Sequence, residues 1–207
     1  MSRRLALLLI LLAVGCGAPP AGPSGAPSPR SRAPVGSGSG AAGPALDPDR
    51  LARSIHDATN EARRRQGVGP LAWDARLAPV AAAHSRDMAR RGFFDHVSPE
   101  GADANDRARR AGVRCEAPLA PGRVRVGVLE NLYKTSRWTA WRERTVGGRT
   151  TRDYDWQTPE AITRAVVDGW LASPGHRRNL LDPSARGEAV AVGLAADDAV
   201  YVTQVLC

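Results

Sequence analysis

Apolar residues recur at helical spacing in the stretch Pro48–Gln66, where charged residues fill most positions between them. Asp47 precedes this stretch and is a candidate N-cap, because its carboxylate can accept hydrogen bonds from the free backbone amides of a first helical turn. Gly67 follows and ends the pattern. The sequence therefore predicts an amphipathic helix over 48–66.

A second helical pattern runs from about Asp74 to Arg91 and ends at Gly92. Pro79 conflicts with a helix that starts at Asp74, because an interior proline loses a backbone hydrogen bond and clashes with the preceding turn. Two interpretations remain open. The helix begins near Leu77, or it bends at the proline.

Two shorter helices are predicted over 103–111 and 159–171. Runs rich in β-branched residues predict strands over 123–129, 189–195 and 199–206, and the pair Asp197-Asp198 is typical of a turn that joins the last two strands into a hairpin. We therefore expect an α+β fold in which helices flank a small, mainly antiparallel sheet.

The N-terminal part shows a different pattern, so the 207 residues predict one folded domain over 47–207. Residues 1–15 combine two arginines with an apolar run too short to cross a bilayer as a mature helix, which predicts an export signal. The sequence Ala13-Val14-Gly15-Cys16 resembles a bacterial lipoprotein cleavage box with Cys16 as the lipidated residue. Cleavage elsewhere, followed by simple secretion, is the alternative. Residues 16–46 are rich in Ala, Gly, Pro and Ser, a composition that predicts a flexible tether.

The cysteines and the charge add two expectations. If Cys16 carries lipid, only Cys115 and Cys207 remain, and in an exported protein we expect them to form a disulfide. The formal net charge of +8 falls to +6 when the signal is removed, and most of the excess is arginine. Arginine suits anionic partners, but a GC-rich coding sequence also raises arginine content and is the simpler explanation.

Candidate chemistry lies in three short, polar phrases that contain His96, Glu130 and His176. Ser-Pro follows His96 by two residues and Ser-Pro-Gly precedes His176, so both imidazoles are expected at defined turns, where functional side chains are often found. Two histidines and a glutamate match an open catalytic zinc site in number and type, although no His-Glu-x-x-His motif is present. Of the other histidines, His84 is at helical spacing with core residues and is expected to be buried or at the boundary of the core. His56 lies one step off the apolar stripe and is expected on the helix surface or packed against a neighbour.

Several unlinked motifs together resemble a bacterial member of the CAP (SCP-like) superfamily over about residues 48–207. The motifs are Asn60-Glu61-Ala62-Arg63, Phe94-Asp95-His96-Val97-Ser98-Pro99, Glu130-Asn131-Leu132, the run from Gly169 to Leu181, and Tyr201-Val202-Thr203-Gln204. The resemblance implies a three-layer α-β-α sandwich and a central cleft with two histidines and two acids, which in some members holds a divalent metal such as zinc.

Carried over to this chain, the resemblance makes His96 and His176 the histidine pair and metal ligands, and Glu130 one acid of the cleft. Leu129 replaces the glycine that usually precedes this acid. For the second acid, Asp106 is the best match and Glu100 the competitor. The alternative for Asp106 is a solvated residue at the start of a helix.

The largest departure from the family pattern is an insertion at about 133–157, which interleaves tryptophans with arginines. Such a segment could stack on sugars or lie at a membrane interface, but an insertion that folds its tryptophans against the domain is the simpler interpretation. Nucleic acid is not an expected partner of an exported protein.

Three classes of function fit these observations. We favour a monomeric, lipid-anchored binding module of the cell envelope or exterior, whose cleft takes a lipid, a peptide or another envelope component and binds metal weakly. The alternative is a peptide or ester hydrolase with Glu130 or Asp106 as the catalytic candidates, because a carboxylate beside a bound cation can activate water. A serine triad through Ser173 is disfavoured, since the turn around it more simply shapes the loop. A purely structural envelope protein is the third class.

Overall fold

The computed structural model describes residues 43–207. The predicted export signal, the lipidation site Cys16 and most of the predicted tether lie outside this range. None of the helices in the described range is both long and apolar enough to cross a membrane.

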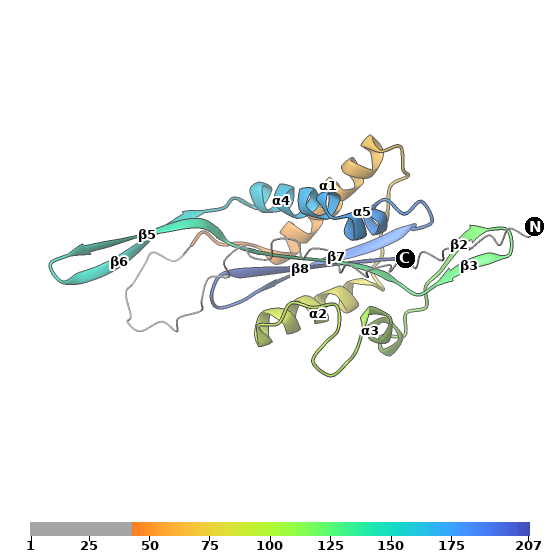
Figure 1. Ribbon diagram of the computed structural model, residues 1–207, viewed down its shortest axis with the longest axis horizontal. Helices are drawn as coiled ribbons and strands as arrows, with labels where there is room; N and C mark the ends of the chain where they lie inside the picture. Colours follow the sequence, from red (N-terminus) through yellow and green to blue (C-terminus); the bar gives the residue numbers. More distant parts are fainter. Residues whose placement is uncertain (1–42) are drawn as a thin grey trace, which may run out of the picture. The chain divides into compact units, whose positions relative to one another are not determined.

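A four-stranded mixed sheet forms the centre of the domain (Figure 1). Its strand order is β1-β7-β8-β4, with bounds Ala72–Trp73, Gly187–Leu194, Ala199–Leu206 and Leu129–Ser136. The β7–β8 and β8–β4 pairs are antiparallel, and only the short β1 runs parallel to its neighbour. The small, mainly antiparallel sheet and the final hairpin predicted from the sequence are therefore confirmed.

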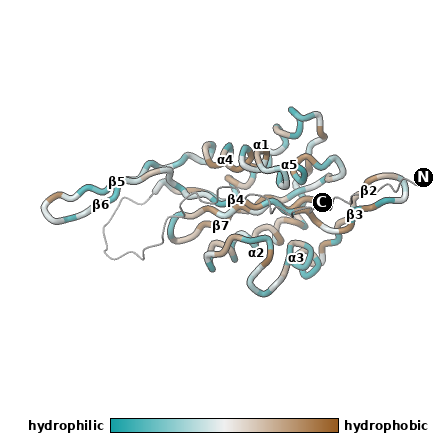
Figure 2. The backbone as a smooth tube through the Cα atoms, in the orientation of Figure 1, coloured by the Kyte–Doolittle hydropathy of each residue, from teal (hydrophilic) through white to brown (hydrophobic). Residues whose placement is uncertain are grey.

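Helices cover both faces of this sheet, which confirms the α+β sandwich. One face carries α1 (Pro48–Arg65), α4 (Pro159–Ala172) and α5 (Pro174–Leu180), and the other carries α2 (Ala78–Arg91) and α3 (Ala104–Arg110). Each layer buries its own apolar cluster, because alternate residues of a strand point to opposite faces. The hydrophobic segments of the tube drawing accordingly gather along the sheet and the helix sides that touch it (Figure 2).

The ends of the helices follow from local chemistry. The Asp47 carboxylate accepts hydrogen bonds from the amides of Asp49 and Arg50 and so caps α1 as expected. Of the two interpretations of Pro79, the later start holds, because Leu77 is the N-cap of α2 and the proline lies in its first turn.

Two glycines allow neighbouring segments of the domain to approach each other closely. The expected strand over 123–129 is interrupted at Gly127, which has a φ of 101° and no space for a side chain beside Asn105. Gly193 in β7 lies against the backbone carbonyl of Ser85, so α2 can pack closely on the sheet.

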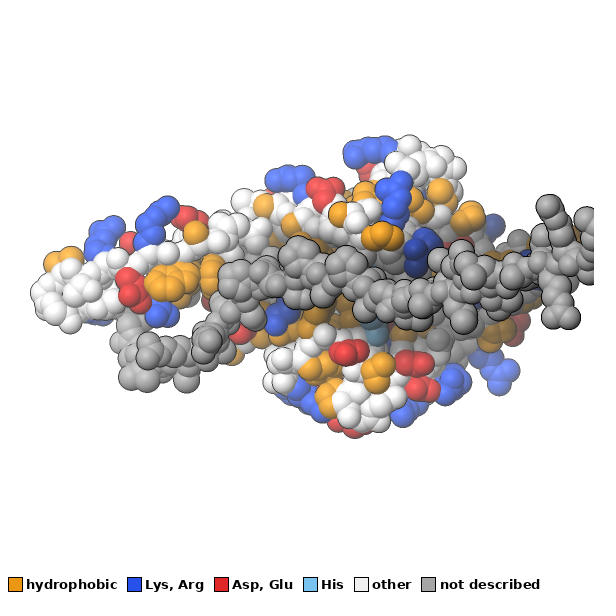
Figure 3. Space-filling view, viewed as in Figure 1, with side chains coloured by type: hydrophobic (Ala, Val, Ile, Leu, Met, Phe, Trp, Pro, Cys, Tyr) orange, Lys and Arg blue, Asp and Glu red, His pale blue; other side chains and the backbone are white. Residues whose placement is uncertain are grey.

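The insertion forms a hairpin that extends away from the sandwich (Figure 1). Its strands are β5 (Trp138–Val146) and β6 (Arg149–Trp156). A second, smaller hairpin is formed by β2 (Glu116–Ala120) and β3 (Arg123–Val126). The expectation that the insertion folds its tryptophans against the domain is not met by Trp141, a residue that is 43 % exposed. Basic, acidic and hydrophobic side chains lie side by side on the hairpin (Figure 3). Its arginines form ion pairs with acidic residues of the opposite strand.

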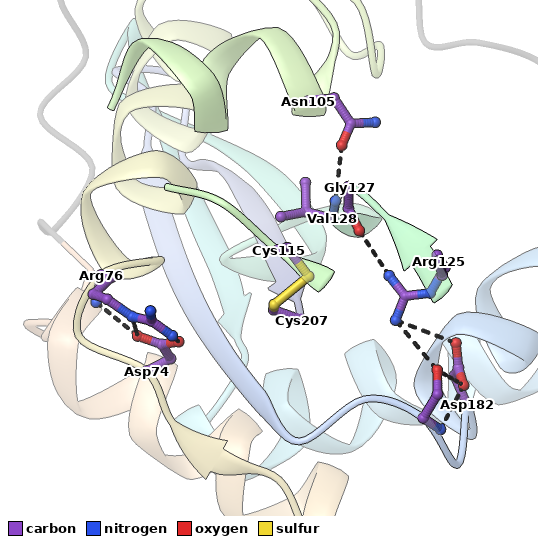
Figure 4. The surroundings of a disulfide bond; sticks show 10 residues. Asp74, Arg76, Asn105, Cys115, Arg125, Gly127, Val128, Asp182 and Cys207 are labelled. Atoms are coloured by element: carbon purple, nitrogen blue, oxygen red, sulfur yellow. Dashed lines mark hydrogen bonds and ion pairs between the residues drawn. A yellow bond between two sulfur atoms is a disulfide. The ribbon is translucent and has the colours of Figure 1, made fainter. Parts of the chain in front are cut away.

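Cys115 and Cys207 form a disulfide with a Cα–Cα distance of 5.5 Å, as expected from the cysteine count (Figure 4). The bond ties the end of β8 to the segment that follows α3. Close by, Arg125 of β3 donates a hydrogen bond to the carbonyl of Gly127 and pairs with Asp182, which follows α5, so this ion pair also connects distant segments of the chain.

We expect the double substitution Cys115→Ser and Cys207→Ser to lower the free energy of unfolding by about 2–4 kcal/mol, because the bond limits the freedom of the unfolded chain. Urea denaturation measures this difference. As a control, a reducing agent should destabilise the native protein and leave the double variant unchanged. Equal stability of the oxidised native protein and the variant would contradict the prediction.

Candidate functional site

The candidate site lies where β4 forms an edge of the central sheet. Glu130 and Asn131 are consecutive on this strand and stand opposite Val205 and Gln204 of β8. Because successive side chains of a strand point to opposite faces, Glu130 faces the α2/α3 layer and Asn131 faces the layer of α1, α4 and α5. One strand therefore supplies a polar group to each layer.

The Glu130 carboxylate is held by two partners. Its Oε1 atom lies 2.8 Å from Nδ1 of His96, and its Oε2 accepts a hydrogen bond of 2.6 Å from the Arg107 guanidinium. Only 3 % of the Glu130 side chain is exposed. Arg107 also donates to the carbonyls of His96 and Ala102, so α3 fixes both the glutamate and the loop that carries the histidine.

His176 reaches the same place from α5. Its backbone carbonyl accepts a hydrogen bond of 3.1 Å from the Asn131 amide, and Asn179 donates to the backbone of Glu130 and the side chain of Asn131. The ring centroids of His96 and His176 lie 6.3 Å apart. A loop and the start of helix α5, which are far apart in the sequence, thus bring the predicted histidine pair together beside β4.

The two imidazoles have pKa values shifted in opposite directions. The hydrogen bond to Glu130 and the charge of that carboxylate raise the pKa of His96 above its ordinary 6.5, against the effect of partial burial. Burial lowers the pKa of His176, and the neighbouring His96 lowers it further. His96 therefore keeps its proton to a higher pH than an ordinary histidine, and His176 loses its proton at a lower pH.

The second predicted acid is not brought to this pair. Asp106 lies in the first turn of α3, where its carboxylate accepts a hydrogen bond from the amide of Asp103 in a capping box and pairs with Arg109. The competitor Glu100 pairs with Arg91 instead. Ser173 occupies the N-cap position of α5, but within the described residues its hydroxyl makes neither a capping hydrogen bond nor a hydrogen bond to His176.

A second histidine–glutamate pair lies in the α1 layer, and no sequence signal indicated it. His56 Nδ1 lies 2.7 Å from Glu188, whose side chain is fully buried and accepts a further hydrogen bond from Gln204. Gln204 in turn accepts a hydrogen bond of 2.7 Å from Asn131. A continuous chain of polar contacts thus connects α1 to the strand that holds the site, and His56 has a polar as well as a packing role.

A tightly held metal ion needs at least three ligands that converge on one point. Within residues 43–207, no three His, Cys, Asp or Glu side chains are grouped so that they could hold one. The reason is local, because the cationic Arg107 takes one oxygen of Glu130 and His96 takes the other. A three-ligand zinc site of His96, Glu130 and His176 does not fit this arrangement, which leaves at most the two imidazoles.

Comparison with known proteins gives a family match over most of the described domain. The model of the cysteine-rich secretory protein family, CAP, matches residues 56–206. Among curated proteins, the chain is 27 % identical to the uncharacterized protein YkwD and 30 % identical to the uncharacterized membrane protein YlbC, both of Bacillus subtilis (strain 168). The alignments cover 64 % and 63 % of this chain but only 38 % and 28 % of those relatives, so the chain spans a minor part of their length.

Two solved structures share the fold. An extracellular protein with an SCP domain from Bacillus anthracis str. Ames superimposes with a TM-score of 0.51 and 27 % identity, over 80 % of this chain and 44 % of that one. An outer surface protein from Borrelia burgdorferi gives a TM-score of 0.54 at 14 % identity, over 78 % of this chain and 94 % of that one. The second match concerns the fold alone.

We expect a histidine NMR titration to give a pKa above 6.5 for His96 and below 6.5 for His176. The raised pKa means that protonated His96 stabilises the fold below about pH 6.5, and this contribution is lost as the pH rises through the folded-state value. The lowered pKa of His176 acts in the opposite sense, so its protonation costs stability as the pH falls.

The variant His96→Gln provides the control for this titration. It removes the neighbouring positive charge, so the pKa of His176 should move up toward 6.5. Two histidines that titrate together, or a His176 pKa that does not respond to His96→Gln, would show that the rings are not coupled in this way.

Proposed function

The chain belongs to the cysteine-rich secretory protein (CAP) family, and from this premise we propose that it is an exported binding module whose ligand contacts the His96 and His176 imidazoles. The similar Bacillus anthracis protein that is described as extracellular supports export, as do the disulfide and the predicted leader. Lipidation at Cys16 would hold the module at a membrane, and the predicted tether would let the domain reach a partner nearby.

The state of Glu130 is the observation that carries this proposal. A general base must be free to take a proton from water, but this carboxylate is 3 % exposed and bonded to cationic or hydrogen-bonding partners at both oxygens. Its geometry suits a different task, which is to fix the ring of His96 and keep it protonated. The glutamate therefore acts on the ligand through the histidine.

The histidine pair then offers complementary hydrogen bonding. His96 uses Nδ1 on Glu130, so its Nε2–H is directed to a ligand as a charge-assisted donor, and half of this side chain is exposed. Neutral His176 adds one donor and one acceptor. A lipid head group, a peptide or another envelope component with a carboxylate or phosphate oxygen next to a polar group fits this pattern.

Hydrolysis by the same histidine pair is the second candidate. The opposite pKa shifts of the two imidazoles favour it, since a pair of titratable groups with separated pKa values can act as acid and base. Such a hydrolase requires His176, and not Glu130, to act as the general base that accepts a proton from water. The absence of a hydrogen bond between Ser173 and His176 in the described residues gives a serine mechanism no support.

We expect no turnover of peptide or ester substrate libraries beyond the level given by the double variant His96→Ala and His176→Ala. The assays are run with and without a chelator, and the folding of the variant is checked by circular dichroism. Turnover by the native protein that the double variant lacks would replace the binding module with the hydrolase.

Metal binding is proposed only as a weak contact of the two imidazoles. In a calorimetric titration, zinc should bind the native protein weakly and the double variant His96→Ala and His176→Ala not at all. The variant Arg107→Gln should bind zinc about tenfold more tightly or better, because it frees a carboxylate oxygen of Glu130 as a third ligand. Arg109→Gln is the matched control, since this exposed arginine of the same helix does not contact Glu130.

Two results would contradict this account of the metal. One is tight zinc binding by the native protein, which would mean that Glu130 is already available. The other is an equal gain in affinity for Arg107→Gln and Arg109→Gln, which would reflect only the loss of a positive charge.

A further inference from the structure

The β5/β6 hairpin, which extends away from the sandwich, has two different faces (Figure 1). Because alternate residues of a strand point to the same side, the register of the hairpin decides which side chains share a face. One face, here called the aromatic face, carries three successive cross-strand pairs: Trp141 with Tyr154, Glu143 with Arg152, and Thr145 with Thr150. The histidine pair of the proposed function is not part of this hairpin.

The aromatic face ends in an indole that is open to solvent. Nearer the domain, the ring of Tyr154 lies 5.7 Å from that of Trp138 and 5.0 Å from that of Trp156, so these three rings cover one another in part. Trp156 also packs against Gly43, where no space is left for a side chain. Trp141 lies farther out along the hairpin and is 43 % exposed.

Polar groups hold the Trp141 ring and continue the face toward the turn. The Arg152 guanidinium lies 4.7 Å from the centroid of the indole, and two hydrogen bonds to Glu143 hold it there. Both charged side chains are still about half exposed. Farther along, the hydroxyls of Thr145 and Thr150 are hydrogen-bonded to each other at 2.9 Å and lie on exposed residues. An open aromatic surface is thus followed by groups that can donate and accept hydrogen bonds.

The charges of the hairpin strands argue against a membrane as the partner. On the aromatic face, Arg152 is paired with Glu143. The opposite face carries two further arginine–aspartate pairs, Arg142 with Asp155 and Arg144 with Asp153. Binding to an anionic lipid surface gains from cations that are in excess over acids, whereas these three arginines are matched by three acids. An uncharged polar ligand fits this balance better.

We propose that the aromatic face binds a neutral oligosaccharide made of hexoses with equatorial substituents, such as glucose or N-acetylglucosamine. The axial C–H groups of such a ring form an apolar, weakly positive surface, which packs on the negative face of an aromatic ring. The part of Trp141 that Arg152 leaves open provides this contact. Hydroxyls at the edge of the sugar ring then reach the Glu143–Arg152 pair, and a longer chain reaches the threonines.

The turn of the hairpin favours binding by fixing the platform in advance. Gly147 and Gly148 both have positive φ, the conformation of a two-residue turn that matches the twist of paired strands. A platform that is already ordered loses little conformational freedom when a ligand binds. This site lies outside the histidine pair, so the proposal goes beyond the proposed function.

Calorimetry on the full chain tests the proposal with β-1,4-linked tetramers of glucose and of N-acetylglucosamine. At least one tetramer should bind with a dissociation constant in the millimolar range or tighter, and more tightly than its dimer, because Trp141 and Thr145 lie about 13 Å apart along the strand. Vesicles with phosphatidylglycerol and a polyproline peptide are the competing probes. Binding of either probe without binding of a tetramer would overturn the proposal, as would binding of no probe at all.

Variants of the two faces separate the indole from the integrity of the hairpin. Trp141→Ala should weaken binding of the tetramer by about tenfold or more, and Trp141→Tyr, which keeps an aromatic ring, should lose less. The matched control Arg144→Ala removes a long, exposed side chain from the opposite face of the same strand and should leave binding unchanged. Equal losses for Trp141→Ala and Arg144→Ala would overturn the proposal.

A second readout needs no substitution in the protein that binds the ligand. The indole N–H signal of Trp141, assigned in NMR spectra by its loss in Trp141→Ala, should shift when the tetramer is added. A signal that does not respond would contradict the proposal. The variant with His96→Ala and His176→Ala should bind the tetramer normally, so failure of this site and failure of the proposed binding module are distinguishable.

Discussion

The alternation of side chains along a β-strand is the constraint on which the site depends. At the edge strand β4, it sends Glu130 into one helical layer and Asn131 into the other, and each residue organises the polar groups of its own side. Glu130 gathers Arg107 and His96, while Asn131 bonds the backbone of His176. A shift of register by one residue would exchange the two and dismantle the pair of histidines.

Buried polar contacts make this register costly to lose. The side chain of Asn131 is fully buried and shares hydrogen bonds with Gln204 and Asn179, and Gln204 extends the chain to Glu188. An unpaired buried polar group costs about 1–3 kcal/mol, so each member holds its neighbours in place. The network thus supports α5 and the ring of His176 from within the core, although it contacts no ligand.

Local sequence signals predicted much of this fold but only part of the site. Periodicity and capping indicated helices α1 to α4 and the final hairpin, since these depend on neighbours in the chain, and the turn-rich phrases indicated His96, Glu130 and His176. Helix α5 was not predicted. The roles of Arg107 and Glu188 could not be predicted, because they follow from how α3 packs and from the strand register. The family resemblance pointed to Asp106 as the second acid, but in the structure its carboxylate caps and pairs within its own helix.

The account implies that an internal cation, Arg107, pairs in this chain with Glu130, the acid that would otherwise bind a metal or activate water. A crystal structure of the protein grown with zinc tests this most directly. We predict that Glu130 keeps its contacts with Arg107 and His96 and that any zinc ion contacts imidazole alone. Zinc bound to the Glu130 carboxylate, with Arg107 displaced, would contradict the account.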